Sequence, residues 1–180
     1  MAVVALIPFV FVACSSSSNA ATPLASVQTA TPVPGEPPGV KTYTGVAHKH
    51  VDTPVKYPQS PPVGGNHSSA WQNCQYYDTS VPNERAVHSL EHGAVWITYL
   101  PNTSQADRAV LRALAATGDH ILVSGYPGQP APIVATAWGK QLYLQTVNDP
   151  ELQQFVNFFQ SGPHSPEPGV TCRDSTDATT

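Results

Sequence analysis

One thirteen-residue run constrains the fold and chemistry of this chain more than any other. Two histidines and a carboxylate lead directly into an apolar segment in Val87-His88-Ser89-Leu90-Glu91-His92-Gly93-Ala94-Val95-Trp96-Ile97-Thr98-Tyr99. Only 11% of all residues are charged, so such groups are scarce. Imidazole is the commonest protein metal ligand. The run therefore predicts a site at the start of a buried strand, with a metal ion as its first candidate.

The spacing of His88 and His92 places both rings on one side of a helix and also on one side of a strand. On a strand Glu91 points the other way, so we expect it to orient a ligand or to pair with Arg85. Gly93 would let the chain turn or bulge beside the bound species. The alternative is that the histidines are structural and bind only backbone carbonyls.

The first residues are typical of an export signal. Residues 2–13 are apolar but too few to span a bilayer as a helix. Phe11-Val12-Ala13-Cys14 resembles a bacterial lipobox, which implies that Cys14 carries a lipid anchor; a plain secretory signal is the alternative. In both cases the protein is extracytoplasmic. We expect a signal peptide over 1–14, a disordered Ser/Pro/Thr linker over 15–40, a globular domain over 41–174 and a disordered tail over 175–180.

The remaining cysteines form an even pair. If Cys14 is lipidated, only Cys74 and Cys172 remain, and an oxidising compartment favours a disulfide between them. A thiolate metal ligand at Cys74, seven residues after His67, is the alternative. The net charge is −4 and no cluster of basic residues occurs, so nucleic acid is not an expected partner.

The pattern of the body predicts an α+β fold. Residues 41–82 are loop-like and should wrap the domain. Strands are expected over 94–100 and 121–124, and a hairpin over 133–146 that turns at Gly139-Lys140. One helix should begin after Thr103 or Ser104 and bury Ala109, Val110, Ala113 and Leu114; another should begin at Asp149-Pro150 and bury Leu152, Phe155, Val156 and Phe159. We expect a single mixed or antiparallel sheet with two helices packed on it.

Several motifs together resemble one bacterial family. They are His50, Tyr57, Pro61-Pro62-Val63-Gly64-Gly65-Asn66-His67, Trp71, Asn73-Cys74, the Val87–Gly93 run, Tyr99, Ser124-Gly125-Tyr126-Pro127, Ala137-Trp138-Gly139 and Cys172. The chain resembles the DUF3105 family of exported or membrane-tethered domains, which is common in actinobacteria. The resemblance implies no known activity. It directs attention to His50, His67, His88 and His92, which occupy motif positions.

The favoured function is a metal-binding lipoprotein. The expected ligands are His67, His88 and His92 with His50 as a fourth. Glu91 and Tyr99 are expected to contact these ligands without binding the metal themselves. Copper is preferred to zinc because an exported site made only of imidazoles suits Cu(II).

Two other functions remain open at this point. One is a cell-envelope hydrolase with His88 or His92 as general base, although no recognisable nucleophile or metallohydrolase motif is present. The other is a cell-envelope binding module that uses Tyr57, Trp71, Tyr76 and Tyr77.

Overall fold

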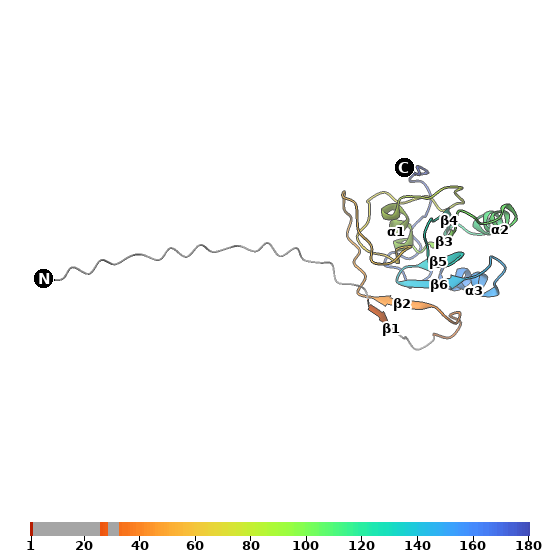
Figure 1. The fold of residues 1–180 in the computed structure, drawn as a ribbon, viewed down its shortest axis with the longest axis horizontal. Helices are drawn as coiled ribbons and strands as arrows, with labels where there is room; N and C mark the ends of the chain where they lie inside the picture. The colour runs from red at the N-terminus through yellow and green to blue at the C-terminus, as the bar shows by residue number, and fades with distance from the viewer. Residues whose placement is uncertain (2–25, 29–32) are drawn as a thin grey trace.

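A mixed β-sheet organises the domain (Figure 1). The computed structural model describes Met1, residues 26–28 and residues 33–180. In this described part of the chain six strands lie in the order β1-β2-β6-β5-β3-β4, and only β3 and β4 are parallel. The strands are β1 (Ser26–Gln28), β2 (Lys41–Thr44), β3 (Val95–Tyr99), β4 (Ile121–Gly125), β5 (Ile133–Ala137) and β6 (Lys140–Leu144); the helices are α1 (Asn83–Glu91), α2 (Gln105–Ala115) and α3 (Pro150–Phe159).

The fold class is α+β, as predicted, but three helices are present where two were expected. The additional helix is α1, which includes the first five residues of the run that begins at Val87. Its first turn has no side-chain cap, since Pro82 occupies the N-cap position. A helix without a capping residue leaves little signal in the sequence. Ala86, Val87 and Leu90 are fully buried in it, so packing onto the body stabilises α1.

Both faces of the sheet centre are covered. Along β3 the side chains of Val95, Ile97 and Tyr99 enter the core shared with α2 and α3, whereas Trp96 enters a second core beneath α1. This follows from the two-residue period of a strand. In Figure 1, α1 lies to one side of the central strands and α2 and α3 lie to the other. The start of β3 therefore meets the end of α1 inside the protein.

The predicted hairpin and the last helix are confirmed. Strands β5 and β6 pair from Ala137 and Lys140, so the turn is Trp138-Gly139, one residue before the predicted Gly139-Lys140; Gly139 has φ +67°. The N-cap of α3 is Asp149, whose side chain accepts from Glu151 N. The stripe of α3 that was expected to be buried is buried: Leu152, Phe155, Val156 and Phe159.

The predicted buried face of α2 is confirmed only at Leu114, which packs against the first core; the other three residues expected there do not. Leu111 and Ala115 are its buried residues, while Val110 is 42% exposed and Ala109 and Ala113 are also exposed. Alanine contributes little area, so the larger Leu111 decides which side of the helix turns toward β4. The N-cap is Ser104, one of the two residues expected there.

Residues 45–82 contain no helix and no named strand, and short backbone bridges hold them to the body. One bridge joins His50 to His67 within this segment, and two others connect it to the body, from Gln72 to Thr176 and from Tyr76 to Val123 of β4. Lys41–Thr44 forms β2, although the sequence predicted loop there. Cys14 and most of the expected linker lie outside the described residues. Within the described part, none of the helices is long and apolar enough to cross a bilayer.

Candidate metal centre

Four side chains from three segments meet beside α1. They are His50, His67, His88 and Glu91, and one ligand atom of each lies within 4.8 Å of the others. His88 and Glu91 are three positions apart on α1 and therefore share a face. The bridge between His50 and His67 brings the other two together, with Val51 N donating to His67 O at 2.7 Å and His67 N to Lys49 O at 3.0 Å.

The two buried imidazoles are fixed in orientation by backbone carbonyls. His67 Nδ1 donates to Gly65 O at 2.8 Å, and His88 Nδ1 donates to Ser68 O at 2.7 Å. A carbonyl can only accept, so each Nδ1 carries a proton. In the neutral ring Nε2 then holds a lone pair, the form that binds a metal.

Burial lowers the pKa of His88 to about 4. The hydrogen bond to Ser68 opposes this shift, and the neighbouring imidazoles of His92, His67 and His50 add to it. Three imidazoles this close would repel one another if charged. His88 is consequently neutral at pH 7 and available as a ligand.

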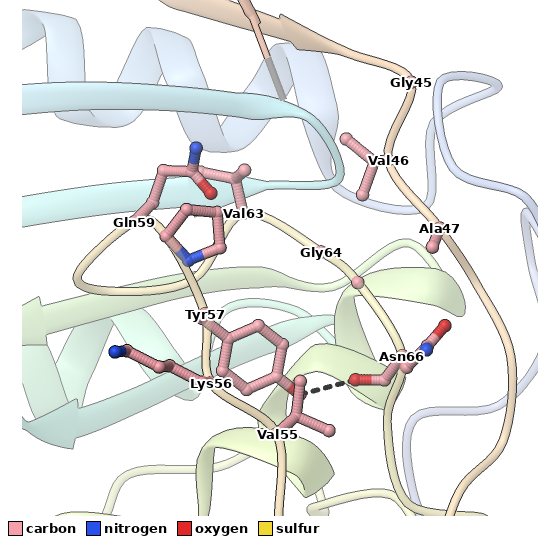
Figure 2. A pocket seen from close by; sticks show the side chains of 12 residues that line it. Gly45, Val46, Ala47, Val55, Lys56, Tyr57, Gln59, Val63, Gly64 and Asn66 are labelled. Carbon is pink, nitrogen blue, oxygen red and sulfur yellow. Dashed lines mark hydrogen bonds between the residues drawn. The ribbon is translucent and has the colours of Figure 1, made fainter. Parts of the chain in front are cut away.

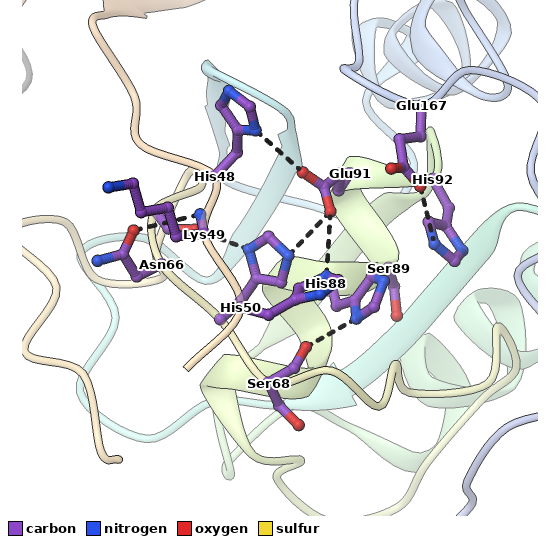
Figure 3. Close-up of polar contacts among 12 residues, drawn as sticks. His48, Lys49, His50, Asn66, Ser68, His88, Ser89, Glu91, His92 and Glu167 are labelled. Carbon is purple, nitrogen blue, oxygen red and sulfur yellow. Dashed lines mark hydrogen bonds and ion pairs between the residues drawn. The ribbon is translucent and has the colours of Figure 1, made fainter. Parts of the chain in front are cut away.

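Glu91 supplies the negative charge of the group. Its side chain is only 3% exposed, and Oε2 lies 2.9 Å from His67 Nε2 and 3.8 Å from His50 Nε2 (Figure 3). Every ion-pair contact of Glu91 within residues 33–180 is to a histidine, and none is to Lys or Arg. A buried carboxylate is costly without a positive partner. A divalent ion held between Glu91 and the imidazoles would provide one.

Coordination would require the group to contract, because its ligand atoms lie within 4.8 Å of one another. A tetrahedral zinc with ligands at 2.0–2.1 Å separates its ligand atoms by about 3.3 Å. The His67–Glu91 pair is already closer than this, and the His50–Glu91 pair is slightly wider. His50 has a side chain that is 51% exposed, so it is the ligand with room to move.

Two adjacent glycines allow the loop that carries His67 to pack closely against its neighbours. Gly64 and Gly65 have φ values of +138° and +131°. A Cβ on Gly64 would lie 2.5 Å from a Val46 side-chain atom, and one on Gly65 would lie 3.0 Å from the Tyr57 ring. Figure 2 shows the cavity of about 230 Å³ that this loop borders, where the Tyr57 hydroxyl donates to Asn66 O. No side chain of the four-residue group lines this cavity.

His92, expected as a ligand, lies outside the four-residue group. Its Nδ1 donates to Thr171 O at 2.7 Å, and its Nε2 lies 3.6 Å from Oε2 of Glu167. The ring is close to that of His88, with 4.6 Å between centroids. His92 thus connects α1 to the C-terminal segment.

Of the other residues predicted at the site, one belongs to the four-residue group and two have partners elsewhere. Glu91, expected behind the ligands, lies among them, a position that the helical spacing from His88 could have indicated. Arg85, considered as its partner, donates to Ala178 O instead. The hydroxyl of Tyr99 donates to Tyr77 O and lies 3.0 Å from that of Tyr76.

The aromatic residues considered for recognition pack on the body. Trp71 lies against His88 and His92, with ring centroids 5.5 and 4.8 Å away, and Tyr76 stacks on Tyr99. Tyr77 is buried and donates to Asn73 O. These contacts, with the hydrogen bond from Tyr57 to Asn66 O, give all four aromatics named for a binding surface internal partners.

The disulfide is present between Cys74 and Cys172, which are 98 positions apart. It holds the C-terminal segment beside the second core, where Cys74 N donates to Cys172 O at 2.7 Å. Both sulfurs are therefore unavailable as thiolate ligands. Disulfides persist in oxidising compartments, which indicates an extracytoplasmic protein.

The fold and the site together define a disulfide-bonded α+β domain with a buried histidine and glutamate cluster that could bind a metal. Residues 48–174 match the family described as "Protein of unknown function (DUF3105)", and the chain belongs to this family. No curated protein and no solved structure matched the chain in the corresponding searches.

Proposed function

We propose that this protein binds one divalent transition-metal ion, Zn(II) or Cu(II), through His50, His67, His88 and Glu91. The observation that carries the proposal is the pair of buried imidazoles, His67 and His88. Each binds a backbone carbonyl through Nδ1, which leaves Nε2 for the group that contains the buried carboxylate. Carbonyls and carboxylates that hold the second ring nitrogen are typical partners of metal-binding histidines.

The donor set narrows the choice of metal. Three nitrogens and one carboxylate oxygen suit Zn(II) and Cu(II), whereas Cu(I) prefers the thiolate and thioether sulfurs that are missing from the group. The carboxylate replaces the fourth imidazole on which the preference for copper depended. By the Irving–Williams order Cu(II) should bind more tightly than Zn(II) in vitro. Which ion is loaded in the cell depends on its supply.

The proposed setting is the outside of the cytoplasmic membrane, with the domain tethered through lipid on Cys14. Support comes from the disulfide and from the lipobox-like sequence. A metal site facing the envelope would acquire its ion from the surrounding medium or from another exported protein. Metabolic labelling with a palmitate analogue tests the anchor, because Cys14→Ser should abolish incorporation.

A metal-dependent hydrolase is a second candidate, and one observation favours it. His67, His88 and Glu91 are buried, whereas His50 is half exposed. Three fixed ligands with one exchangeable position describe many catalytic zinc sites. If His50 gave way to water, the ion could activate it. Hydrolysis of envelope esters or amides that depends on added Zn(II) would favour this candidate over simple binding.

Titration of the metal-free full chain, with any polyhistidine tag removed, tests the proposal. Zn(II), Cu(II) and Cu(I) are added separately while bound metal and melting temperature are followed. We expect one ion per chain for Zn(II) and Cu(II), and loss of tight binding in His67→Ala and His88→Ala. His120→Ala and His164→Ala, which remove histidines outside the group, are the controls. Equal effects of all four substitutions would contradict the assignment.

A further inference from the structure

Another histidine, His48, lies on the solvent side of the four-residue group. His48 Nδ1 is 3.8 Å from Oε1 of Glu91, the carboxylate oxygen that the other histidines do not approach (Figure 3). The side chain of His48 is 66% exposed. Both oxygens of one buried carboxylate therefore face imidazole nitrogens, one oxygen toward the interior group and one toward solvent.

His48 is not a member of the four-residue group. The ligand atoms of that group all lie within 4.8 Å of one another, and the group does not include His48. Within residues 33–180 its ion-pair contact is with Glu91, at the same distance that separates His50 from the other oxygen. His48 can therefore share an ion with Glu91 at the rim of the site.

The segment that carries His48 is held at both ends, by β2 before it and by the bridge to His67 after it. Lys49 O and Val51 N pair with the backbone of His67, and Lys49 N donates to Asn66 Oδ1 at 3.3 Å. Gly45, on the other side of His48, has φ +70° and no atom near the position of a Cβ. The bridge thus holds His50 against the buried residues of the group, while His48, two residues earlier, keeps an exposed side chain.

An ion that enters this site must pass the exposed histidines, since His67, His88 and Glu91 are buried. Losing several coordination bonds at once is slow, whereas replacing them one at a time keeps the ion coordinated throughout. His48 offers a first ligand that solvent can reach, and Oε1 of the buried Glu91 lies 3.8 Å from its Nδ1. Rotation of the carboxylate then brings the ion to Oε2 and the inner imidazoles.

We propose that His48 is an exchange ligand, which binds the metal transiently with Glu91 and passes it to and from the four-residue group. Each step replaces one metal–ligand bond by another, so no electron is transferred. This inference rests on the proposed metal site and adds the route by which the ion exchanges. A residue used only on the route lowers the barrier equally in both directions and leaves the equilibrium affinity unchanged.

The test uses the full chain and Zn(II) as the probe. Release is followed by transfer of Zn(II) to an excess of a chromophoric chelator, uptake by transfer from a weak Zn(II)–citrate complex, and Kd by competition. In His48→Ala we expect both rates to fall about tenfold, which corresponds to an activation free energy raised by about 1.4 kcal/mol. The Kd should stay within about twofold of the wild-type value. His48→Asn provides a second variant that keeps a polar side chain at this exposed position.

His120→Ala is the control, since His120 binds Val170 O and lies outside the group. It should exchange Zn(II) at the wild-type rate. Wild-type rates in both His48 variants would overturn the inference and leave the metal site in place. A weaker Kd matched by faster release would also overturn it, because His48 would then be an ordinary ligand. Failure of the wild-type chain to bind Zn(II) or Cu(II) would overturn the proposed function and this inference together.

Discussion

Nε2 of His67 lies 2.9 Å from Oε2 of Glu91, yet no hydrogen bond joins the two atoms. The Nδ1 proton of His67 is directed to Gly65 O, so in the neutral ring a nitrogen lone pair faces a carboxylate oxygen. Such a contact is favourable only when a cation, either a proton or a metal ion, lies between the atoms. Metal and proton therefore compete for this position, and metal binding should release protons.

Glu91→Gln should remove most of the stabilisation that metal provides. An ion that binds only the folded state, at a free concentration of a hundred times Kd, stabilises the wild-type chain by about 2.7 kcal/mol. The amide of glutamine is neutral and a poor ligand, so we expect little rise in Tm when Zn(II) is added to this variant. Glu167→Gln is the matched control, because Glu167 faces His92 outside the group. A full metal-induced shift in Glu91→Gln, measured by differential scanning fluorimetry, would contradict the role of the carboxylate.

Gly65→Ala should weaken metal binding although it changes no ligand. The position has φ +131°, and a Cβ there would lie 3.0 Å from the Tyr57 ring. We expect strain of the order of 1–3 kcal/mol and displacement of the loop that carries His67. Gly128→Ala is the control, since its φ is +78° but no atom lies within 4 Å of the new Cβ. Calorimetric titration with Zn(II) should show weaker binding in Gly65→Ala alone; equal affinities would contradict the seating of His67 by this loop.

Binding of Cu(II) should quench tryptophan fluorescence. Trp71 lies 5.5 Å from the ring of His88, and Trp138 lies 6.1 Å from that of His67. A paramagnetic ion at these histidines is close enough to both indoles to quench them, whereas Zn(II) is diamagnetic. Trp71→Phe and Trp138→Phe should each reduce the quenched fraction, and the double variant should show the smallest quenched fraction. Equal quenching in the double variant would place copper elsewhere.

His88 should make the stability of the metal-free protein depend on pH. Its pKa is about 4 in the folded state, against an ordinary value of 6.5. Between these values the unfolded chain binds a proton that the folded chain does not, so acid favours unfolding. The contribution of His88 to the free energy of unfolding is fully present above pH 6.5 and is lost as the pH falls toward 4. This change is of the order of 3 kcal/mol.

Urea unfolding between pH 7 and pH 4 measures this dependence. His88→Asn removes the titrating ring, and its free energy of unfolding should fall less steeply over this range. The experiment needs a chelator throughout, because bound metal would add its own pH dependence. Parallel curves for the two proteins would contradict a neutral, buried His88.

Removal of the disulfide should destabilise the domain strongly. The cysteines are 98 positions apart, and the chain-entropy model assigns about 4 to 5 kcal/mol to a crosslink of this length. Cys74→Ser with Cys172→Ser should lower the free energy of unfolding by roughly this amount in urea titrations. Loss of less than about 1 kcal/mol would show that the backbone contacts of the C-terminal segment hold it without the crosslink.

Local sequence determined much of the framework. Caps at Ser104 and Asp149 fixed the starts of α2 and α3, because a side-chain oxygen there satisfies a free amide of the first turn. Alternation and turn chemistry around Gly139 gave the β5–β6 hairpin. The pairing of Cys74 with Cys172 followed from counting the cysteines that remained, and the structure confirms it.

Only the tertiary structure decided which residues form the group that could hold a metal. The run from His88 to His92 was compatible with helix and strand, and packing of Leu90 into the second core resolves it as helix α1. That choice turns Glu91 toward His88 and the buried side of the cluster, while His92 turns to Thr171. Long-range contacts thus reversed the roles expected of two residues that are neighbours in sequence.

The sequence by itself therefore determined the residue types that could hold a metal, the order of most elements and the oxidising setting. The fold decided which residues meet, since His50 and His67 come together through a backbone bridge and reach α1 from loops far away in the chain. Spacing along a chain records contacts within one element, because helices and strands have fixed periods. Contacts between loops and a helix have no such period, and they arise only when burial brings the segments together.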